Sequence, residues 1–152
     1  MSNADSLLIQ ARQAAKRAHC PYSNFRVGAT VRCDDGTVIN GCNVENASYG
    51  LSVCAERVAL FTAISLGKRP LELAMSCIDA QADGSLCSRM PCGACRQVMQ
   101  ELLPNGAHVS IDGVGTIPLE HLFPTPFQLG DSSINQQLQR DNRYDPKDPQ
   151  PL

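Results

Sequence analysis

Two very short connections between apolar segments constrain the fold of this chain more than any other feature. Segments 25–33 and 37–43 are separated by only three residues, and so are segments 107–112 and 116–118. A parallel connection within a sheet needs a crossover of a dozen or more residues, so each pair can form only an antiparallel hairpin. The sequence therefore predicts two hairpins, one early and one late in the chain.

Helical and extended segments alternate between the two hairpins. The pattern predicts helices over 3–19, 53–66 and 92–103, with Gly67 as the C-terminal cap of the second helix. Segment 72–80 is a nearly continuous apolar run, which is typical of a strand that is buried on both faces. Strands that alternate with helices predict a layered α/β domain with a mixed sheet.

The length and charge of the chain limit the number of domains it can form and the kinds of partner it can bind. With 152 residues it has room for one domain, which we place at 1–130, followed by a polar, proline-containing tail at 131–152. The chain has thirteen Lys and Arg residues and fifteen Asp and Glu residues, and its basic residues form no cluster in the sequence. This charge pattern argues against a nucleic-acid partner. No apolar stretch approaches the length of a membrane span and the N-terminus lacks a signal-like apolar region, so we expect no membrane partner and a cytoplasmic location.

Eight cysteines are expected in a reducing compartment, where thiols serve as metal ligands or as small buried side chains. Three of them fall at predicted helix starts, where the helix dipole and free N–H groups favour thiolates: Cys54, Cys92 and Cys95. The spacing of Cys92 and Cys95 puts both sulfurs on one helix face. Two helix starts can thus present three thiolates to one Zn²⁺ and leave its fourth position open, which is the pattern of a catalytic zinc.

Two charged residues that follow Cys54 in the sequence have side chains suited to assist a catalytic zinc ion. Glu56 follows Cys54 by two residues, about 200° around an ideal helix, so it is poorly placed as a ligand and better placed as a proton shuttle. A reaction that uses a zinc-activated water needs such a shuttle. Arg57 follows Cys54 by three residues on the same face, so its guanidinium can donate to that sulfur and withdraw charge from the thiolates.

The same cysteines could serve roles other than catalysis. A Cys-x-x-Cys pair alone could be a redox pair or half of a structural zinc site, and Cys87 could close a four-cysteine site. The combination with Cys54-Ala55-Glu56 favours the catalytic zinc. The remaining cysteines lie in or beside predicted core elements, where small buried side chains are expected: Cys20, Cys33, Cys42 and Cys77.

Three separate motifs resemble the small homotetrameric cytidine deaminases. They are CPYSNFRVGA at 20–29, GCNVENA at 41–47 and PCGACRQ at 91–97, and the resemblance covers about residues 5–130. It implies a three-layer α/β/α sandwich with a mixed five-stranded sheet, in which strands 4 and 5 are antiparallel. It also implies one Zn²⁺ per chain, a homotetramer, and the hydrolytic deamination of cytidine and 2′-deoxycytidine to uridine and 2′-deoxyuridine plus ammonia in pyrimidine salvage.

The resemblance also implies roles for individual residues. By this likeness, zinc is bound by Cys54, Cys92 and Cys95, Glu56 shuttles protons, Asn43 and Glu45 hold the ribose 3′-hydroxyl, Phe25 packs on the base, and Ala55 takes part in substrate binding. Without it, Asn43 would be a turn-forming residue, Glu45 a solvated carboxylate and Phe25 a core side chain.

Two aromatic residues are implied to act in trans, on the substrate of a neighbouring subunit. They are Tyr49, in the loop before the second helix, and Phe127, near the end of the domain. The alternative is that both side chains cap the core of their own chain. The sequence departs from the family pattern at Phe123 and at the added Pro126, which bears on the geometry at Phe127.

Competing functions are distinguished by the same residues. Related enzymes on this scaffold deaminate aminoacyl-nucleoside antibiotics, polynucleotides or guanine-like bases. The segment Asn43-Val44-Glu45-Asn46 favours a nucleoside with an unmodified ribose, and the acidic balance disfavours DNA and RNA. A structural zinc module that binds a protein partner is the non-enzymatic alternative, and it would have no need of Glu56.

Overall fold

Five strands form one mixed sheet in the order β2-β1-β3-β4-β5 in the computed structural model, which describes residues 3–128. The strands are β1 Val27–Cys33, β2 Val38–Cys42, β3 Pro70–Cys77, β4 His108–Ile111 and β5 Gly115–Pro118. Strand β1 runs antiparallel to both β2 and β3, β3 and β4 are parallel, and β4 and β5 are antiparallel. The two predicted hairpins and the mixed sheet are therefore confirmed.

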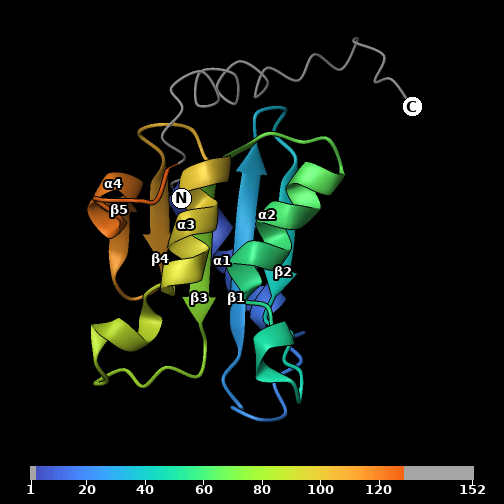
Figure 1. Cartoon of the computed structure of the whole chain (residues 1–152). Helices are drawn as coiled ribbons and strands as arrows, with labels where there is room; N and C mark the ends of the chain where they lie inside the picture. Colours follow the sequence, from blue (N-terminus) through green and yellow to red (C-terminus); the bar gives the residue numbers. More distant parts are fainter. Residues whose placement is uncertain (1–2, 129–152) are drawn as a thin grey trace.

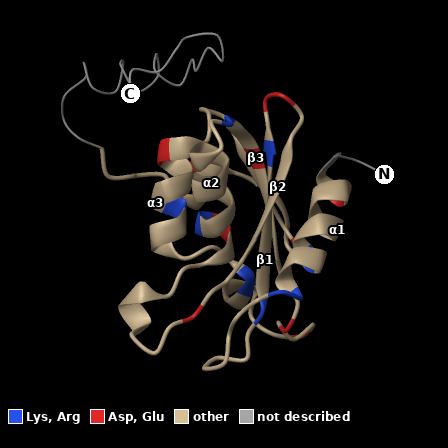
Figure 2. Ribbon diagram, turned by 90° about the vertical axis from the view of Figure 1, so that its right-hand side faces the viewer, with Lys and Arg blue, Asp and Glu red and all other residues tan. Residues whose placement is uncertain are grey.

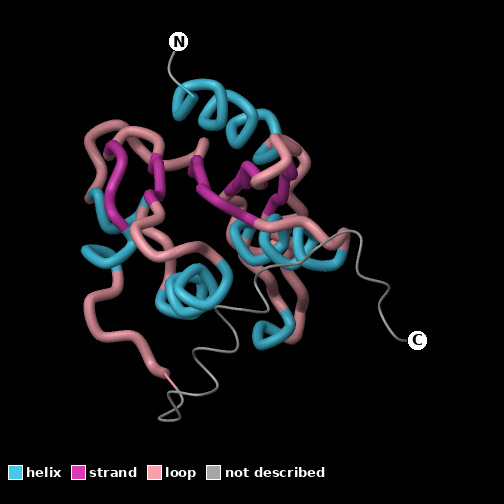
Figure 3. Tube along the Cα trace, turned by 90° about the horizontal axis from the view of Figure 1, so that it is seen from above, coloured by secondary structure: helices cyan, strands magenta, loops and turns pink. Residues whose placement is uncertain are grey.

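Helices cover both faces of this sheet. They are α1 Asn3–Ala15, α2 Ala55–Ser65, α3 Gly93–Leu102 and the short α4 Leu119–Leu122, with 3-10 helices η1 Tyr49–Leu51 and η2 Leu86–Arg89. Helix α1 lies on one face of the sheet, and α2 and α3 lie side by side on the other (Figures 1 and 3). The predicted three-layer α/β/α sandwich is thus confirmed, with its apolar core between these layers.

Two glycines allow the helices to approach the sheet closely. A Cβ atom at Gly28 in β1 would overlap the backbone of α1 at Ala11 and Ala15. A Cβ atom at Gly41 in β2 would likewise overlap the backbone of α2 at Ala55 and Ala59. Because α2 begins at Ala55, the glycine in β2 fixes how far the start of this helix lies from the sheet.

The end of α2 follows the predicted pattern. Gly67 has a positive φ of 66°, its N–H donates to the carbonyl of Ile64, and the N–H of Lys68 donates to the carbonyl of Ala63. These two bonds form the Schellman motif, in which glycine is favoured because it adopts the left-handed conformation without a Cβ clash.

Two of the predicted elements have bounds that differ clearly from the structure. The first helix was predicted over 3–19 but ends at Ala15, after which three successive i→i−3 bonds tighten the chain and His19 pairs with Val44. The strand predicted over 72–80 is β3, at Pro70–Cys77, because the chain turns where Asp79 accepts hydrogen bonds from Arg26.

Charged side chains are interspersed over the molecule. Figure 2 shows Lys and Arg in blue and Asp and Glu in red, scattered along the ribbon over several elements. Among the residues that the structure describes, several ion pairs join positions far apart in the sequence, such as Arg12 with Asp112 at 2.6 Å and Arg26 with Asp79 at 2.6 Å. Within residues 3–128, no helix is both long and apolar enough to cross a membrane. The predicted tail at 131–152 lies outside the described residues.

Candidate metal centre and active site

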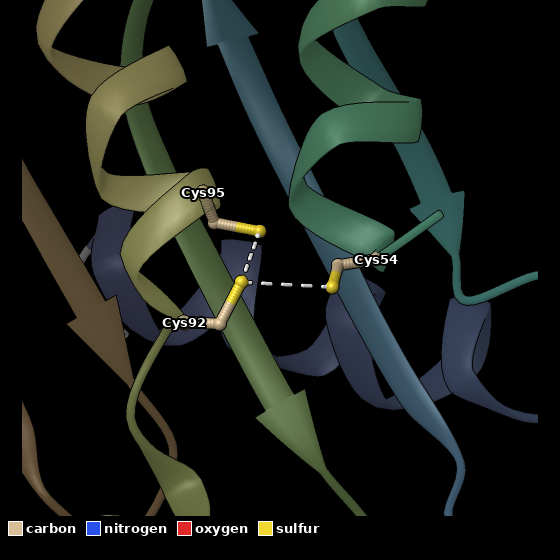
Figure 4. A group of neighbouring side chains, drawn as sticks. All are labelled: Cys54, Cys92 and Cys95. Atoms are coloured by element: carbon tan, nitrogen blue, oxygen red, sulfur yellow. Dashed lines mark hydrogen bonds between the residues drawn. The ribbon is translucent and has the colours of Figure 1, made fainter. Parts of the chain in front are cut away.

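Three thiols converge between the first turns of α2 and α3. Cys54 is the N-cap residue of α2, Cys92 is the N-cap residue of α3, and Cys95 lies in the first turn of α3. The Sγ atom of Cys92 is 3.9 Å from that of Cys54 and 3.4 Å from that of Cys95 (Figure 4). The positive ends of both helix dipoles therefore point to one place, as the sequence predicted.

The arrangement of the sulfur atoms fits zinc. With Zn–S bonds of about 2.3 Å, tetrahedral geometry requires sulfurs about 3.8 Å apart. The three Sγ atoms lie within 4.8 Å of one another, and they form the group suited to a metal ion in residues 3–128. Cys87 is exposed in η2 and stands outside this group, so the ligand set leaves one position of a tetrahedral ion open.

The surroundings favour thiolate at Cys54. Hydrogen bonds from Cys95, Arg57 and Cys92 lower its pKa to about 5, against the opposing effect of burial. Cys95 is buried and its pKa is raised, because its proton is held in the hydrogen bond to Cys54. A zinc ion replaces such protons, since its cysteine ligands bind as thiolates.

Glu56 is a buried carboxyl group beside these thiols. It is the second residue of α2 and only 2% exposed. Burial raises its pKa to about 7, and the charge of Cys54 acts in the same direction. A carboxyl group with this pKa can both accept and return a proton near neutral pH. Glu56 is not part of the three-thiol group.

Arg57 lies against the same cluster. Its Nη2 atom is 3.8 Å from the Sγ of Cys54 and 3.4 Å from the carbonyl oxygen of Ser52. Its Nε atom is buried and has no hydrogen-bond partner within the described residues. The guanidinium thus contributes a positive charge close to the thiol that α2 presents.

The predicted sugar-binding residues lie next to the turn that carries Phe25. The side chain of Asn43 accepts a hydrogen bond from the N–H of Val27 at 2.8 Å and donates to the carbonyl of Phe25 at 2.9 Å. The carboxylate of Glu45 accepts hydrogen bonds from the N–H groups of Tyr22 and Ser23 and from the hydroxyl of Ser23. Phe25 itself is partly buried and packs against the core cluster.

The other predicted substrate residues differ in exposure. Ala55 is fully buried at the start of α2. Tyr49 is 77% exposed in η1, where its ring meets that of Tyr22 edge-on at a centroid distance of 6.1 Å. Phe127 is 70% exposed, although its backbone N–H and carbonyl are both hydrogen-bonded to the side chain of Gln97. Neither Tyr49 nor Phe127 is buried in the core of its own chain.

Two polar residues that hold predicted site residues in place were not predicted from the sequence. Ser23 bonds both Glu45 and the backbone of Phe25, and its position two residues before Phe25 is the pattern of a serine turn. Gln97 has no comparable local signal, because the residue it binds follows thirty positions later.

The four cysteines that were expected to be small buried side chains differ in their burial. Cys33 and Cys77 are buried, as predicted, and this burial raises the pKa of each thiol. Cys20 and Cys42 are only partly buried.

The sequence and the fold match one protein family. Residues 1–108 match the family model described as the cytidine and deoxycytidylate deaminase zinc-binding region. A cytidine deaminase of Halalkalibacterium halodurans is 43% identical over 129 residues, which cover 82% of this chain and 94% of the relative. A cytidine deaminase of Mycobacterium tuberculosis is 47% identical over 122 residues, which cover 80% of this chain and 86% of the relative.

A solved structure agrees with the sequence matches. The crystal structure of a cytidine deaminase from Burkholderia pseudomallei superposes with a TM-score of 0.73 at 41% identity, covering 84% of this chain and all of that chain. The likeness in structure therefore extends over most of this chain. The chain belongs to the cytidine and deoxycytidylate deaminase family.

Proposed function

We propose that this chain is a zinc-dependent cytidine deaminase that hydrolyses cytidine and 2′-deoxycytidine to uridine and 2′-deoxyuridine with release of ammonia. The observation that carries this proposal is the buried, non-ligand Glu56 beside three thiols that leave a zinc ion one open position. A structural zinc site is closed by four protein ligands and has no use for such a carboxyl group. The products place the activity in pyrimidine salvage.

The residues around the metal divide the chemistry between them. Bound zinc supplies a water of lowered pKa as the nucleophile. Glu56 would accept one proton from the attacking water and deliver it to N3 of the cytosine ring. It would then accept the remaining proton of the hydroxyl formed at C4 and transfer it to the amino group, which leaves as ammonia. Its pKa of about 7 matches this exchange, because the group must be deprotonated at the start and protonated midway. Arg57 offsets the negative charge of the thiolates through Cys54.

The nucleoside is held by residues from three segments. Asn43 and Glu45 bind the ribose 3′-hydroxyl, Phe25 packs on the cytosine ring, and the backbone at Ala55 borders the ring beside Glu56. Both polar residues already anchor the turn at 22–25. A free base would bring no 3′-hydroxyl to the acceptor positions that these side chains have left, and sites built to hydrogen-bond a substrate hydroxyl discriminate strongly against a ligand that lacks it.

The assembly that we propose is a cytoplasmic homotetramer with shared sites. Tyr49 and Phe127 would reach the nucleoside of a neighbouring subunit, Tyr49 near the ribose and Phe127 near the base. Their exposure supports this role, because large aromatic rings held on fixed backbone are typical of interface anchors. Eight free thiols, three of them needed as zinc ligands, favour a reducing compartment.

A direct substrate comparison tests the proposed function. The zinc-loaded protein is incubated with cytidine, 2′-deoxycytidine and free cytosine, and the loss of the cytosine ultraviolet absorbance is followed with ammonia release. We expect turnover of both nucleosides and poor turnover of cytosine. A protein that holds zinc but releases no ammonia from either nucleoside would support a structural zinc module instead.

A further inference from the structure

A single serine hydroxyl links two parts of the proposed nucleoside site. The Oγ atom of Ser23 donates to Oε1 of Glu45 at 2.5 Å and accepts from the backbone N–H of Phe25 at 3.0 Å. The directions of both bonds are fixed, because a carboxylate can only accept, a backbone N–H can only donate, and the hydroxyl has one proton. The distance to Glu45 is in the range of hydrogen bonds to a charged oxygen.

The hydrogen bonds to Glu45 leave one of its oxygens with room for a ligand. Oε2 accepts from the N–H groups of Tyr22 at 3.0 Å and Ser23 at 3.2 Å, whereas Oε1 accepts only from the hydroxyl of Ser23 within the described residues. A carboxylate offers about four acceptor positions, two on each oxygen. The remaining position therefore lies on Oε1, and Ser23 is the residue that orients this oxygen.

The backbone of Phe25 is held from both sides. Its N–H is bound by the hydroxyl of Ser23, and its carbonyl is bound by the side-chain amide of Asn43 at 2.9 Å. Asn43 thus acts on Phe25 directly, while Glu45 acts on it through Ser23. The two residues proposed for the sugar and the residue proposed for the base form one hydrogen-bonded unit.

The turn that contains Ser23 has a conformation that needs support. Asn24 has a positive φ of 54°, which is uncommon for residues with a side chain although asparagine tolerates it. Its N–H donates to the carbonyl of Cys20 at 2.9 Å. Ser23 is exposed, so its hydroxyl contributes through these bonds and not through packing in the core.

We propose that Ser23 is a positioning residue for the nucleoside, which orients Glu45 toward the sugar 3′-hydroxyl and Phe25 toward the base. This inference rests on the proposed function. Because the hydroxyl of Ser23 bonds Glu45 and Phe25 and not the thiol cluster, its loss weakens nucleoside binding and leaves the chemical step intact. Weaker binding without a slower step is measured as a higher KM at nearly constant kcat.

The test compares two substrates in four proteins: the wild type, Ser23→Ala, Ser23→Thr and the control Ser65→Ala. Ser65 serves as the control because its hydroxyl, like that of Ser23, is hydrogen-bonded, in this case to the carbonyl of Thr62. It lies at the end of α2, away from the thiols at the start of that helix. Cytidine and 3′-deoxycytidine are assayed by steady-state kinetics. Zinc content and thermal unfolding are measured for every protein, so that a loss of structure is seen directly.

We expect Ser23→Ala to raise the KM for cytidine about tenfold, the scale of one lost hydrogen bond to a charged group. The KM for 3′-deoxycytidine should rise less, because that substrate lacks the hydroxyl that Glu45 binds. The ratio of kcat/KM between the two substrates therefore falls in this variant. Ser23→Thr keeps the hydroxyl and should restore the ratio, and Ser65→Ala should match the wild type.

Several results would overturn the proposal. An unchanged substrate ratio in a zinc-loaded Ser23→Ala protein would do so, as would a Ser23→Thr protein that behaves like the alanine variant. Loss of zinc or of cooperative unfolding in Ser23→Ala would show that the hydroxyl has only a structural role. A wild-type protein that turns over neither substrate would instead refute the proposed function, so the two failures are distinguishable.

Discussion

The Nη2 atom of Arg57, in the first turn of α2, lies 3.8 Å from the Sγ atom of Cys54, the N-cap residue of the same helix. A guanidinium stays protonated at any pH at which the protein is folded, so this charge is permanent. Three thiolates on one Zn²⁺ carry a net negative charge, which weakens the metal as an acid for its water. We propose that this contact would make the zinc-bound water more acidic by offsetting the charge of a zinc ligand.

Replacing this arginine should change how activity depends on pH. In Arg57→Ala the thiolates lose their compensating charge, so the zinc water becomes less acidic, and Glu56 loses a charge that lowers its pKa. Both effects move the acid limb of the kcat/KM profile to higher pH. We expect activity to fall by about 10- to 100-fold, the usual range for a residue that supports a metal ligand. Arg57→Lys keeps the charge and should shift the limb less; an unshifted limb in Arg57→Ala would exclude charge compensation.

Removing the carboxyl group of Glu56 should separate catalysis from metal binding. Glu56→Gln is the preferred variant because the side chain is almost completely buried and glutamine fills the same space. We expect stoichiometric zinc and a loss of rate of about 100-fold or more, the scale of a lost general acid and base. Glu56→Ala should behave alike if the cavity is tolerated. Near-normal turnover by the zinc-loaded Gln variant would rule out the proton-shuttle role.

Cys87, which precedes Cys92 by five residues in the sequence, should be dispensable for zinc binding. Cys87 is exposed in η2 and stands apart from the three converging thiols. Cys87→Ser should therefore keep one zinc per chain and full activity, whereas Cys92→Ser should lose both. Metal analysis of the purified proteins gives the zinc content per chain for each variant. Zinc loss from the Cys87→Ser protein would point to a closed four-cysteine site.

The exposed ring of Phe127 allows a test of shared active sites. Glu56→Gln and Phe127→Ala chains are each expected to be nearly inactive. If Phe127 acts on a neighbouring subunit, subunit exchange creates some sites in which both residues are intact, and activity should partly return. Gln97→Ala is a useful companion, because it removes both hydrogen bonds that hold the backbone of Phe127. Mixed oligomers that stay inactive after verified exchange, or an active monomer, would contradict the shared site.

Stability in acid should depend on the ion pair between Arg26 and Asp79. Hydrogen bonds from the side chain and backbone of Arg26 lower the pKa of Asp79 to about 2. A carboxylate whose pKa is depressed by folding stabilises the protein above its unfolded-state pKa of about 4 and loses that contribution as the pH falls toward 2. Asp79→Asn should therefore be less stable than the wild type at pH 6, with a difference that shrinks below pH 4. Urea unfolding of both proteins between pH 2 and pH 6 measures this difference in the free energy of unfolding. A difference that does not vary with pH would refute the ionic contribution.

The sequence by itself determined those features that depend on neighbouring residues. The two three-residue connections required hairpins, because no crossover fits in them, and Gly67 marked the end of α2 by its freedom to adopt a positive φ. Cys92 and Cys95 shared a helix face because their spacing matches the helical period. The zinc ligands and Glu56 could be proposed for the same reason, since each lies in the first turn of a helix or just before it.

The tertiary structure decided the contacts between residues that are distant in the sequence. The carboxylate of Glu45 is bound by the turn at Tyr22 and Ser23, and Gln97 holds Phe127, across separations of more than twenty residues. It also decided that the first helix ends at Ala15, because His19 finds a strand partner in Val44. No local propensity encodes such partners. Packing of α1 and α2 against β1 and β2 fixes which polar groups come within hydrogen-bonding distance of one another. Buried polar groups must be hydrogen-bonded, so each of them bonds the group that packing has placed beside it.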